Sequence, residues 1–266
     1  MKSKSPIIDL GDHEYPAPPQ GTKKVLVIAG DERYLMTDKG SLFSTGNHPV
    51  ETLVPIFHMN AAGFDLEVAT LSGNMVKFQL WAIPSLDKKI ISFYERFCDV
   101  FRNPRRLSDI SADLTASSDY AAIFIPGGHS ALISLSESQA VAEILRWAMN
   151  NDRFVISLSH GSAAFLSVRH GVNPLYGYSI CSYPGHLDKQ IPSIRYMPRQ
   201  LTQYFDEKLR EMGINLVNNV ITGSVHKDRK VLTGDSPFAA NALGRLAASE
   251  LLAAYVADSC KGGLKL

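Results

Sequence analysis

The sequence predicts an α/β domain built on a parallel sheet, and three observations lead to that prediction. Four short apolar runs, at residues 24–29, 65–71, 120–125 and 154–158, have the length and composition of buried strands. Helical patterns separate several of these runs, which is the alternation that a parallel sheet requires. The chain has 266 residues, 45% of them hydrophobic, which is enough for one large domain with an inserted subdomain.

The amino-terminal part is expected to supply an arm, a strand and a helix. Residues 1–22 are polar and proline-rich, which favours an extended arm. Residues 30–46, after the first strand, are expected to form a long loop. Asn47 is expected to cap a helix with Pro49 in its first turn and Gly63 at its end. The predicted buried face of this helix is Val50, Leu53, Val54, Phe57 and Ala61.

The middle of the chain does not continue this alternation. Residues 75–118 contain an amphipathic stretch and then a basic patch, and we interpret them as a small inserted second domain. The main domain would therefore span residues 23–258, and residues 259–266 would form a tail. Later elements are predicted as helix 137–150, strand 179–183, helix 201–212 and a long Ala-rich helix over 236–258. Segments 220–223 and 230–234 are expected to form a hairpin with His226 and Asp228 in a solvated turn.

The run FVISLSHGSAA at residues 154–164 is the strongest candidate for a catalytic segment. An apolar strand ends abruptly at Ser159, His160 and Gly161, and small helix-compatible residues follow. Such a turn directs its central side chain, here that of Ser159, into a cleft and places helix N–H groups behind it. An ordinary strand-to-helix turn is the competing interpretation.

A second glycine-containing strand end, Ile125-Pro126-Gly127-Gly128-His129, should lie at the same edge of the sheet. Gly128 would let a backbone N–H approach a substrate closely. The N–H groups of Gly128 and His160 are therefore candidate oxyanion donors, and His129 is a candidate lining residue. A sharp loop with no functional role is the alternative.

Charge and cysteine content limit the classes of partner. The net charge of +1 and pI near 7.7 indicate neither a nucleic-acid nor a membrane partner, and no apolar run reaches the length of a membrane span. We expect no signal peptide before the first strand. Cys98, Cys181 and Cys260 form neither a disulfide framework nor a metal-binding pair, so a cytoplasmic location is expected. Cys181 is expected to be an inert buried thiol.

Several long segments together resemble the ThiJ/PfpI superfamily, and within it the bacterial branch of heat-shock chaperones, glyoxalase III enzymes and protein deglycases. The resemblance covers about residues 23 to 258, and its segments are LFSTGNHPVETL, YAAIFIPGGH, FVISLSHGSAAFL and ITGSVHKDRKVLTGDSPFAANALG. It implies a flavodoxin-like α/β sandwich, a small second domain and a homodimer.

The resemblance also assigns catalytic positions. The family's nucleophile is an elbow cysteine, and the matching residue here is Ser159. The following histidine is His160, the orienting acid falls on Asp188, and the glutamate that hydrogen-bonds the family's thiol falls on Glu51. A thiol can ionise in such a site, whereas a serine hydroxyl stays protonated and needs a positioned base. The resemblance therefore implies aldehyde chemistry that the serine weakens or abolishes.

The branch often carries a metal site of two histidines and a glutamate, and the matching positions are Asn60, Asp65 and Phe97. Phe97 cannot bind a metal, and Asn60 is a poor replacement for imidazole. We therefore expect no metal and no cofactor. His58, nearby in the same helix, is expected to be a core or surface residue.

Three functions are compatible with these residues. The first is a stress-related holdase that captures unfolded client proteins on exposed apolar surface and needs no nucleophile. The second is an active glyoxalase III or deglycase acting on small 2-oxoaldehydes such as methylglyoxal and on glycated proteins. The third is a serine hydrolase using Ser159, His160 and Asp188. A further reading is that the serine was introduced to trap the site. The sequence favours the holdase, with reduced or absent aldehyde turnover.

Overall fold

A twisted sheet of seven strands forms the centre of the molecule in a computed structural model that describes residues 14–16, 23–83, 87–190, 192–193 and 197–262. The strand order is β10-β11-β7-β6-β1-β4-β5, and neighbouring strands run parallel except β10 and β11. The four predicted strands are confirmed as β1 (Lys24–Ile28), β4 (Asp65–Thr70), β6 (Tyr120–Ile125) and β7 (Phe154–Leu158). The remaining strands of this sheet are β5 (Arg105–Arg106), β10 (Val225–Asp228) and β11 (Val231–Gly234).

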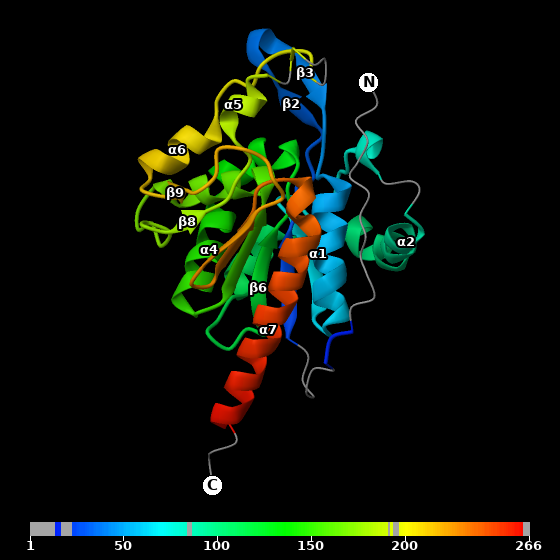
Figure 1. Ribbon diagram of the computed structural model, residues 1–266, viewed down its shortest axis with the longest axis vertical. Helices are drawn as coiled ribbons and strands as arrows, with labels where there is room; N and C mark the ends of the chain where they lie inside the picture. The colour runs from blue at the N-terminus through cyan, green and yellow to red at the C-terminus, as the bar shows by residue number, and fades with distance from the viewer. Residues whose placement is uncertain (1–13, 17–22, 84–86, 191, 194–196, 263–266) are drawn as a thin grey trace.

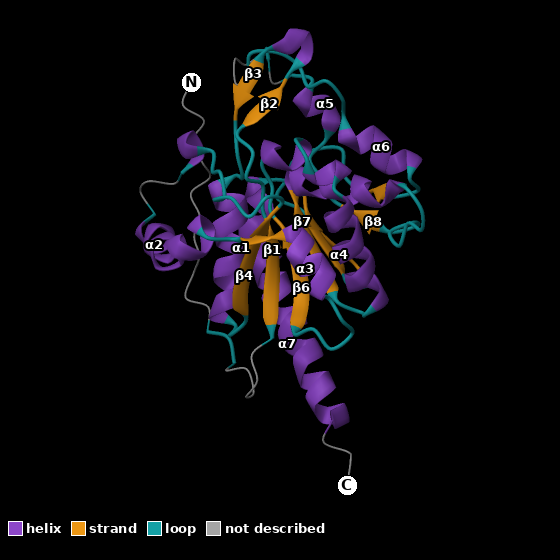
Figure 2. Ribbon diagram, turned by 180° about the vertical axis from the view of Figure 1, so that it is seen from behind, coloured by secondary structure: helices purple, strands orange, loops and turns teal. Residues whose placement is uncertain are grey.

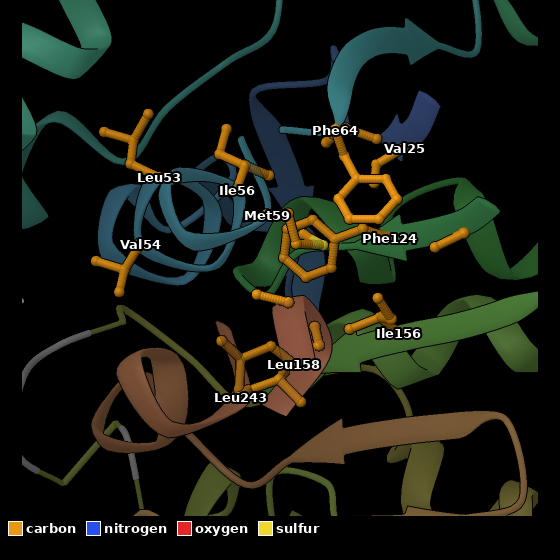
Figure 3. Close-up of a cluster of buried hydrophobic side chains, with 14 of the residues drawn as sticks. Val25, Leu53, Val54, Ile56, Met59, Phe64, Phe124, Ile156, Leu158 and Leu243 are labelled. Atoms are coloured by element: carbon orange, nitrogen blue, oxygen red, sulfur yellow. The ribbon is translucent and has the colours of Figure 1, made fainter. Parts of the chain in front are cut away.

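Helices cover both faces of the sheet, which confirms the predicted α/β sandwich (Figures 1 and 2). On one face α1 (Pro49–Ala61) packs against α7 (Ala240–Gly262), and α2 (Lys88–Arg102) lies outside α1. On the other face lie α3 (Leu107–Asp113) and α4 (Gln139–Asn150). Each face has its own hydrophobic cluster because the parallel strands point apolar side chains to both sides. Figure 3 shows the α1 side, where Met59 of α1 and Leu243 of α7 meet Phe124 and Leu158 of the sheet.

Smaller elements gather beyond the carboxyl ends of the parallel strands. The segment predicted as a loop at 30–46 contains a hairpin of β2 (Tyr34–Met36) and β3 (Leu42–Ser44), so that part of the prediction is wrong. The predicted strand at 179–183 is only β8 (Ser179–Ile180), which pairs with β9 (Asn215–Leu216) outside the main sheet. Two short helices, α5 (Gly185–Asp188) and α6 (Phe205–Glu211), and six 3₁₀ turns complete the described structure. These turns are η1 (Asp38–Gly40), η2 (Leu80–Ala82), η3 (His129–Leu132), η4 (Leu135–Glu137), η5 (Ser159–Arg169) and η6 (Pro237–Ala239).

Several predicted boundaries are wrong for identifiable reasons. The hairpin exists, but its first strand is β10, so His226 and Asp228 lie in a strand instead of a turn. Asp228 accepts a hydrogen bond from the Ser179 N–H and contacts Arg229, which ties β8 to the hairpin. The helix predicted from residue 201 begins at Phe205.

The ends of the two helices on the α1 face also differ from the sequence prediction. The residue before α1 is His48, and Asn47 bonds to other loops instead of capping the helix. Ala61, expected on the buried face, is exposed because the helix turns it outward at its last residue. The closing helix α7 continues to Gly262, beyond the predicted end at residue 258.

The segment predicted as a small inserted domain supplies α2, β5 and α3. Its β5 extends the main sheet beside β4, and Phe93 and Phe101 belong to the hydrophobic cluster on the α1 face. Its independence as a domain stays a prediction. Of the arm at residues 1–22, only residues 14–16 are described, and the rest, with the tail residues 263–266, lies outside the described structure. None of the described helices combines the length and apolarity needed to cross a bilayer.

Candidate active site

Ser159 lies at a sharp turn where β7 ends and η5 begins. Its φ of +56° is in the left-handed region, which is unusual for a residue other than glycine and is typical of strained functional positions. The side chain is buried, with 1% of its residue surface exposed. The local sequence favours this geometry because, apart from His160, the residues from Ser159 to Ala164 are small and can pack tightly at the turn.

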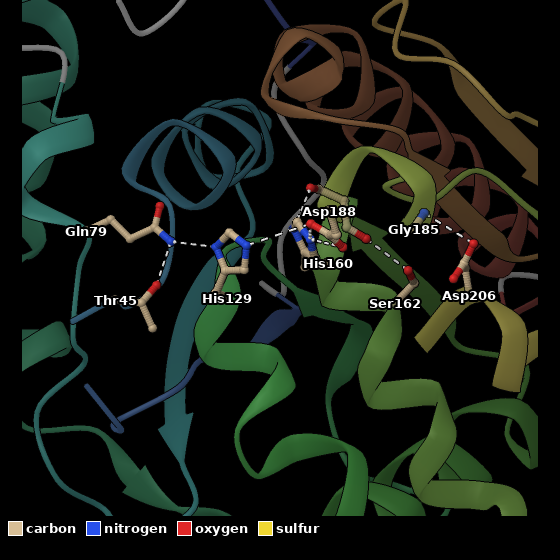
Figure 4. A network of polar contacts seen from close by, with 9 residues as sticks. Thr45, Gln79, His129, His160, Ser162, Gly185, Asp188 and Asp206 are labelled. Atoms are coloured by element: carbon tan, nitrogen blue, oxygen red, sulfur yellow. Dashed lines mark hydrogen bonds and ion pairs between the residues drawn. The ribbon is translucent and has the colours of Figure 1, made fainter. Parts of the chain in front are cut away.

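Three predicted site residues lie in a continuous line of contacts. His160 Nδ1 is 3.4 Å from Ser159 Oγ. His160 Nε2 is 3.0 and 3.1 Å from the two carboxylate oxygens of Asp188 (Figure 4). Because Asp188 only accepts, the proton of a neutral His160 is on Nε2, and the Nδ1 lone pair faces Ser159. The Ser159 contact is long for a hydrogen bond, as catalytic contacts often are before a substrate binds. The arrangement therefore provides an oriented general base for the hydroxyl.

Glu51 lies in the first turn of α1, is 1% exposed and forms a hydrogen bond with Ser159. Gly127 packs directly against it: a Cβ added there would lie 2.3 Å from Glu51 Oε2 and 2.8 Å from the Leu158 carbonyl oxygen. Burial raises the pKa of Glu51 to about 8; a hydrogen bond with Ser159 lowers it, and the charge of Asp235 raises it. Near neutral pH the Glu51 carboxyl is therefore mostly protonated and can donate to Ser159 Oγ.

Gly128 brings the end of β6 against the loop that precedes α1. Its φ is +109°, and a Cβ there would lie 2.4 Å from the His48 nitrogen and 2.5 Å from the Gly46 oxygen. Only glycine fits this backbone. The backbone N–H groups of Gly128 and His160 donate no hydrogen bond to another loop or turn among the described residues. Both stay available as the oxyanion donors that the sequence predicted.

A polar network continues from this centre toward the β2–β3 hairpin (Figure 4). The ring of His129 lies 4.4 Å from the ring of His160, centroid to centroid, and its Nδ1 is 3.5 Å from Gln79 Nε2. Gln79 Nε2 also donates to Thr45 Oγ1 at 2.9 Å. Burial, with the charges of His160 and His48, holds the pKa of His129 well below its ordinary range. His129 is therefore neutral at neutral pH.

Sequence reasoning predicted His129 near the cleft but missed Gln79, Thr45, His48 and Tyr183. The rings of Tyr183 and His160 stack with their centroids 4.3 Å apart. Burial, together with the charge of His160, lowers the pKa of His48 to about 3. No local signal identifies these residues, because contacts between distant segments bring them to the site. Gln79 in particular comes from the segment interpreted as a separate domain.

The other candidates lie away from this centre. Asn60 donates to the Phe64 carbonyl and accepts from Arg96, and the absence of a metal at Asn60, Asp65 and Phe97 stays a prediction. His58 is fully buried between Tyr15 and Asn241, as expected of a core residue. Burial raises the pKa of the Cys181 thiol to about 11, which favours an inert thiol.

The chain is similar to known proteins over most of its length. Residues 42–250 match the model of the DJ-1/PfpI family. The "Protein/nucleic acid deglycase HchA" proteins of Escherichia coli O9:H4 (strain HS) and Shigella sonnei (strain Ss046) are each 64% identical over 251 residues, which is 94% of this chain and 89% of theirs. Among solved structures, glyoxalase III from Candida albicans is 18% identical with a TM-score of 0.67, covering 85% of this chain and 97% of its own. Drosophila melanogaster DJ-1beta is 20% identical with a TM-score of 0.53, covering 92% and 98%. The two solved structures bear on the fold alone.

Proposed function

The chain belongs to the DJ-1/PfpI family, and from that premise we propose that it repairs carbonyl damage, processing small 2-oxoaldehydes and the adducts they form with protein amino groups. The high identity to proteins named as deglycases supports an active aldehyde-processing enzyme better than the holdase with weakened or lost aldehyde activity that the sequence favoured. The observation that carries the proposal is the line of contacts Asp188–His160–Ser159, because it gives the serine the general base that an alcohol requires.

The first step is addition of the serine to the substrate carbonyl. Ser159 Oγ forms a bond to the carbonyl carbon while its proton passes to His160 Nδ1. The carbonyl electron pair moves to oxygen, where the N–H groups of Gly128 and His160 can stabilise the negative charge. Asp188 stabilises the imidazolium that forms. The product of this step is a hemiacetal on Ser159.

The later steps need no external oxidant. The hydrogen on the former aldehyde carbon leaves as a proton, and the neighbouring ketone carbon gains one, so the aldehyde carbon is oxidised as the ketone carbon is reduced. The result is a 2-hydroxyacyl ester of Ser159, which water cleaves with His160 as base to release the 2-hydroxy acid. Glu51, with a pKa of about 8, is placed to move these protons. An amine adduct enters the same route once its C–N bond breaks and releases the amine and the aldehyde.

A serine hydrolase would use the same three side chains, and their contacts are the observation in its favour. The two functions differ in substrate. A hydrolase cleaves a simple activated ester, whereas the proposed enzyme converts methylglyoxal to lactate and frees amines from their adducts.

The test is a side-by-side assay of the purified chain. Lactate formation from methylglyoxal, release of amine from a methylglyoxal–arginine adduct and cleavage of an activated ester are measured for the native protein and for Ser159→Ala. We expect the first two activities in the native protein and a large loss in the variant. Ester cleavage alone would support the hydrolase, and aldehyde activities that survive in Ser159→Ala would contradict the proposed chemistry.

The other expectations from the sequence stay proposals. These are a homodimer, binding of unfolded client proteins, no nucleic-acid partner, no cofactor and a cytoplasmic location. A holdase activity, if the protein has one, should be equal in the native protein and in Ser159→Ala because it does not use the elbow.

A further inference from the structure

Three buried side chains at the candidate active site converge on one point. His129 comes from η3, His160 from η5 and Asp188 from the end of α5, and the potential ligand atoms of all three lie within 4.8 Å of one another. His160 Nε2 is 3.0 Å and His129 Nε2 is 3.9 Å from Asp188 Oδ1. Figure 4 shows the two imidazole rings side by side, with the Asp188 carboxylate at their Nε2 edge. His129 has no role in the proposed reaction, so its position calls for a separate explanation.

We propose that His129, His160 and Asp188 form a binding site for a zinc-class divalent ion, and that this ion switches the catalytic site off when it is bound. Two imidazoles and one carboxylate are a ligand set that suits zinc and its neighbours in the transition series, whereas magnesium and calcium prefer oxygen ligands alone. The inference goes beyond the proposed function and replaces the sequence expectation that the chain binds no metal. The position also differs from Asn60, Asp65 and Phe97.

The distances fit a tetrahedral ion after small movements. Ligand atoms about 2.1 Å from a tetrahedral zinc lie about 3.4 Å from each other. The His160–Asp188 pair, at 3.0 Å, is already near this separation, and His129 at 3.9 Å needs to approach by about half an ångström. The rings are tilted by 34° to each other, so rotation of His129 about its side-chain bonds can turn its Nε2 toward the shared point. Solvent or substrate would supply the fourth ligand.

The residue behind His129 can support metal binding. A histidine that binds a metal through Nε2 carries its proton on Nδ1 and needs an acceptor there. Gln79 is 1% exposed, and its Oε1 has no hydrogen-bond partner among the described residues. Rotating the Gln79 amide by half a turn would let this oxygen accept from both His129 Nδ1 and the Thr45 hydroxyl. The Gln79 oxygen would then be paired, and Nε2 would take the position that the oxygen leaves.

A change in the tautomer of His160 explains why the ion would inhibit the reaction at Ser159. In the metal-free site His160 carries its proton on Nε2 and presents a lone pair at Nδ1 to Ser159. A metal on Nε2 displaces that proton, and a neutral His160 must then carry it on Nδ1. Nδ1 becomes a donor toward Ser159 Oγ and can no longer accept the serine proton. The ion also takes the Asp188 carboxylate that would stabilise the imidazolium.

The test measures metal binding directly and does not depend on catalysis. The full chain is stripped with a chelator and titrated with Zn²⁺ by calorimetry, and with Co²⁺ by visible absorption. We expect one ion per chain and the intense visible bands of a tetrahedral Co²⁺ site. His129→Phe keeps the aromatic ring but removes the ligand nitrogen, and it should weaken Zn²⁺ binding by at least tenfold. His48→Gln is the matched control: it alters a neighbouring histidine outside the ligand set and should leave the affinity nearly unchanged.

The outcomes separate this proposal from the proposed function. Loss of Zn²⁺ binding in His129→Phe but not in His48→Gln supports it, whether or not the native protein turns over an aldehyde. Equal binding in all three proteins would place the ion elsewhere, for example at the exposed Cys260, and would overturn it, as would no binding at all. If circular dichroism finds His129→Phe unfolded, His129→Gln takes its place with the same expectation.

Discussion

At the scale of single residues, Glu51 is where burial most changes chemistry. Its carboxyl lies beside Ser159 with almost no exposed surface, and the cost of burying a charge keeps it protonated to about pH 8. The hydrogen bond from Ser159 lowers the pKa of Glu51, because it favours the ionised carboxylate. The pair therefore places a proton donor and acceptor within reach of the reacting atoms near neutral pH.

This pKa shift makes stability depend on pH in a predictable direction. The ordinary pKa of 4.5 applies in the unfolded chain and about 8 in the folded chain, so between those values the folded state holds one more proton at Glu51. The free energy of unfolding should therefore fall as pH rises, by up to about 1.4 kcal/mol per pH unit from this group. Glu51→Gln removes this contribution. Urea unfolding of both proteins from pH 5 to 8 checks it: the variant should gain stability relative to the native protein across the range, and parallel curves would contradict the shift.

Ser159→Cys tests how much the alcohol limits catalysis. A thiol ionises several pKa units more readily than an alcohol, and the N–H groups at the start of η5 favour an anion at this position. We expect kcat/KM for methylglyoxal to rise by roughly a hundredfold or more, since each pKa unit corresponds to about 1.4 kcal/mol. The rate of lactate formation is the measurement. Equal rates for serine and cysteine would mean that His160 already removes the proton without limiting the reaction.

At the scale of elements, the loop before α1 connects three parts of the site. Asn47 Oδ1 accepts from the Gly30 N–H at 3.0 Å, and Asn47 Nδ2 donates to the carbonyls of Gly30 and Lys77 at 2.7 and 2.8 Å. These bonds join the end of β1, the start of α1 and the segment that carries Gln79. The same loop packs closely against Gly128, because the Gly46 carbonyl oxygen lies where a side chain of residue 128 would be.

Asn47→Ala should therefore destabilise the protein by roughly 2–4 kcal/mol, because the buried Gly30 N–H loses its acceptor and two carbonyls lose a donor. Asn74→Ala is the control. The Asn74 side chain is exposed and, among the described residues, bonds only to Ser72 Oγ, so its removal should change the stability by no more than about 0.5 kcal/mol. The midpoint and slope of urea unfolding measure both. A loss in Asn47→Ala no larger than in the control would show that other bonds hold this loop.

The sequence predicted the parallel strands and the elbow because their signals are local. Each strand is a short apolar run, and the turn at Ser159 is marked by small residues on its helix side. The β2–β3 hairpin and the exact extent of β10 could not be predicted in this way. Both are short and partly exposed, and the pairing of their residues with a neighbour, more than their own composition, makes them strands.

At the scale of the whole molecule, the site exists because the parallel sheet brings distant segments to one edge. The ends of β6 and β7, the start of α1 and the helix α5 meet beyond the carboxyl ends of the strands, where open α/β sheets bind ligands. That rule let the sequence place Gly128 and Ser159 at a common edge. The positions of Glu51 and Asp188 came from the family resemblance, and Gln79 needed the structure, since only long-range contacts bring it to His129.

The proposed reaction depends on Ser159 acting on carbonyl substrates with His160 as its base. The most direct measurement is the rate of lactate formation from methylglyoxal by the native protein and by Ser159→Ala, with circular dichroism confirming that both are folded. We expect measurable turnover in the native protein and a loss of at least about a hundredfold in the variant, since removing a nucleophile leaves only binding and oxyanion stabilisation. Native protein without turnover, or a variant as fast as the native protein, would contradict it.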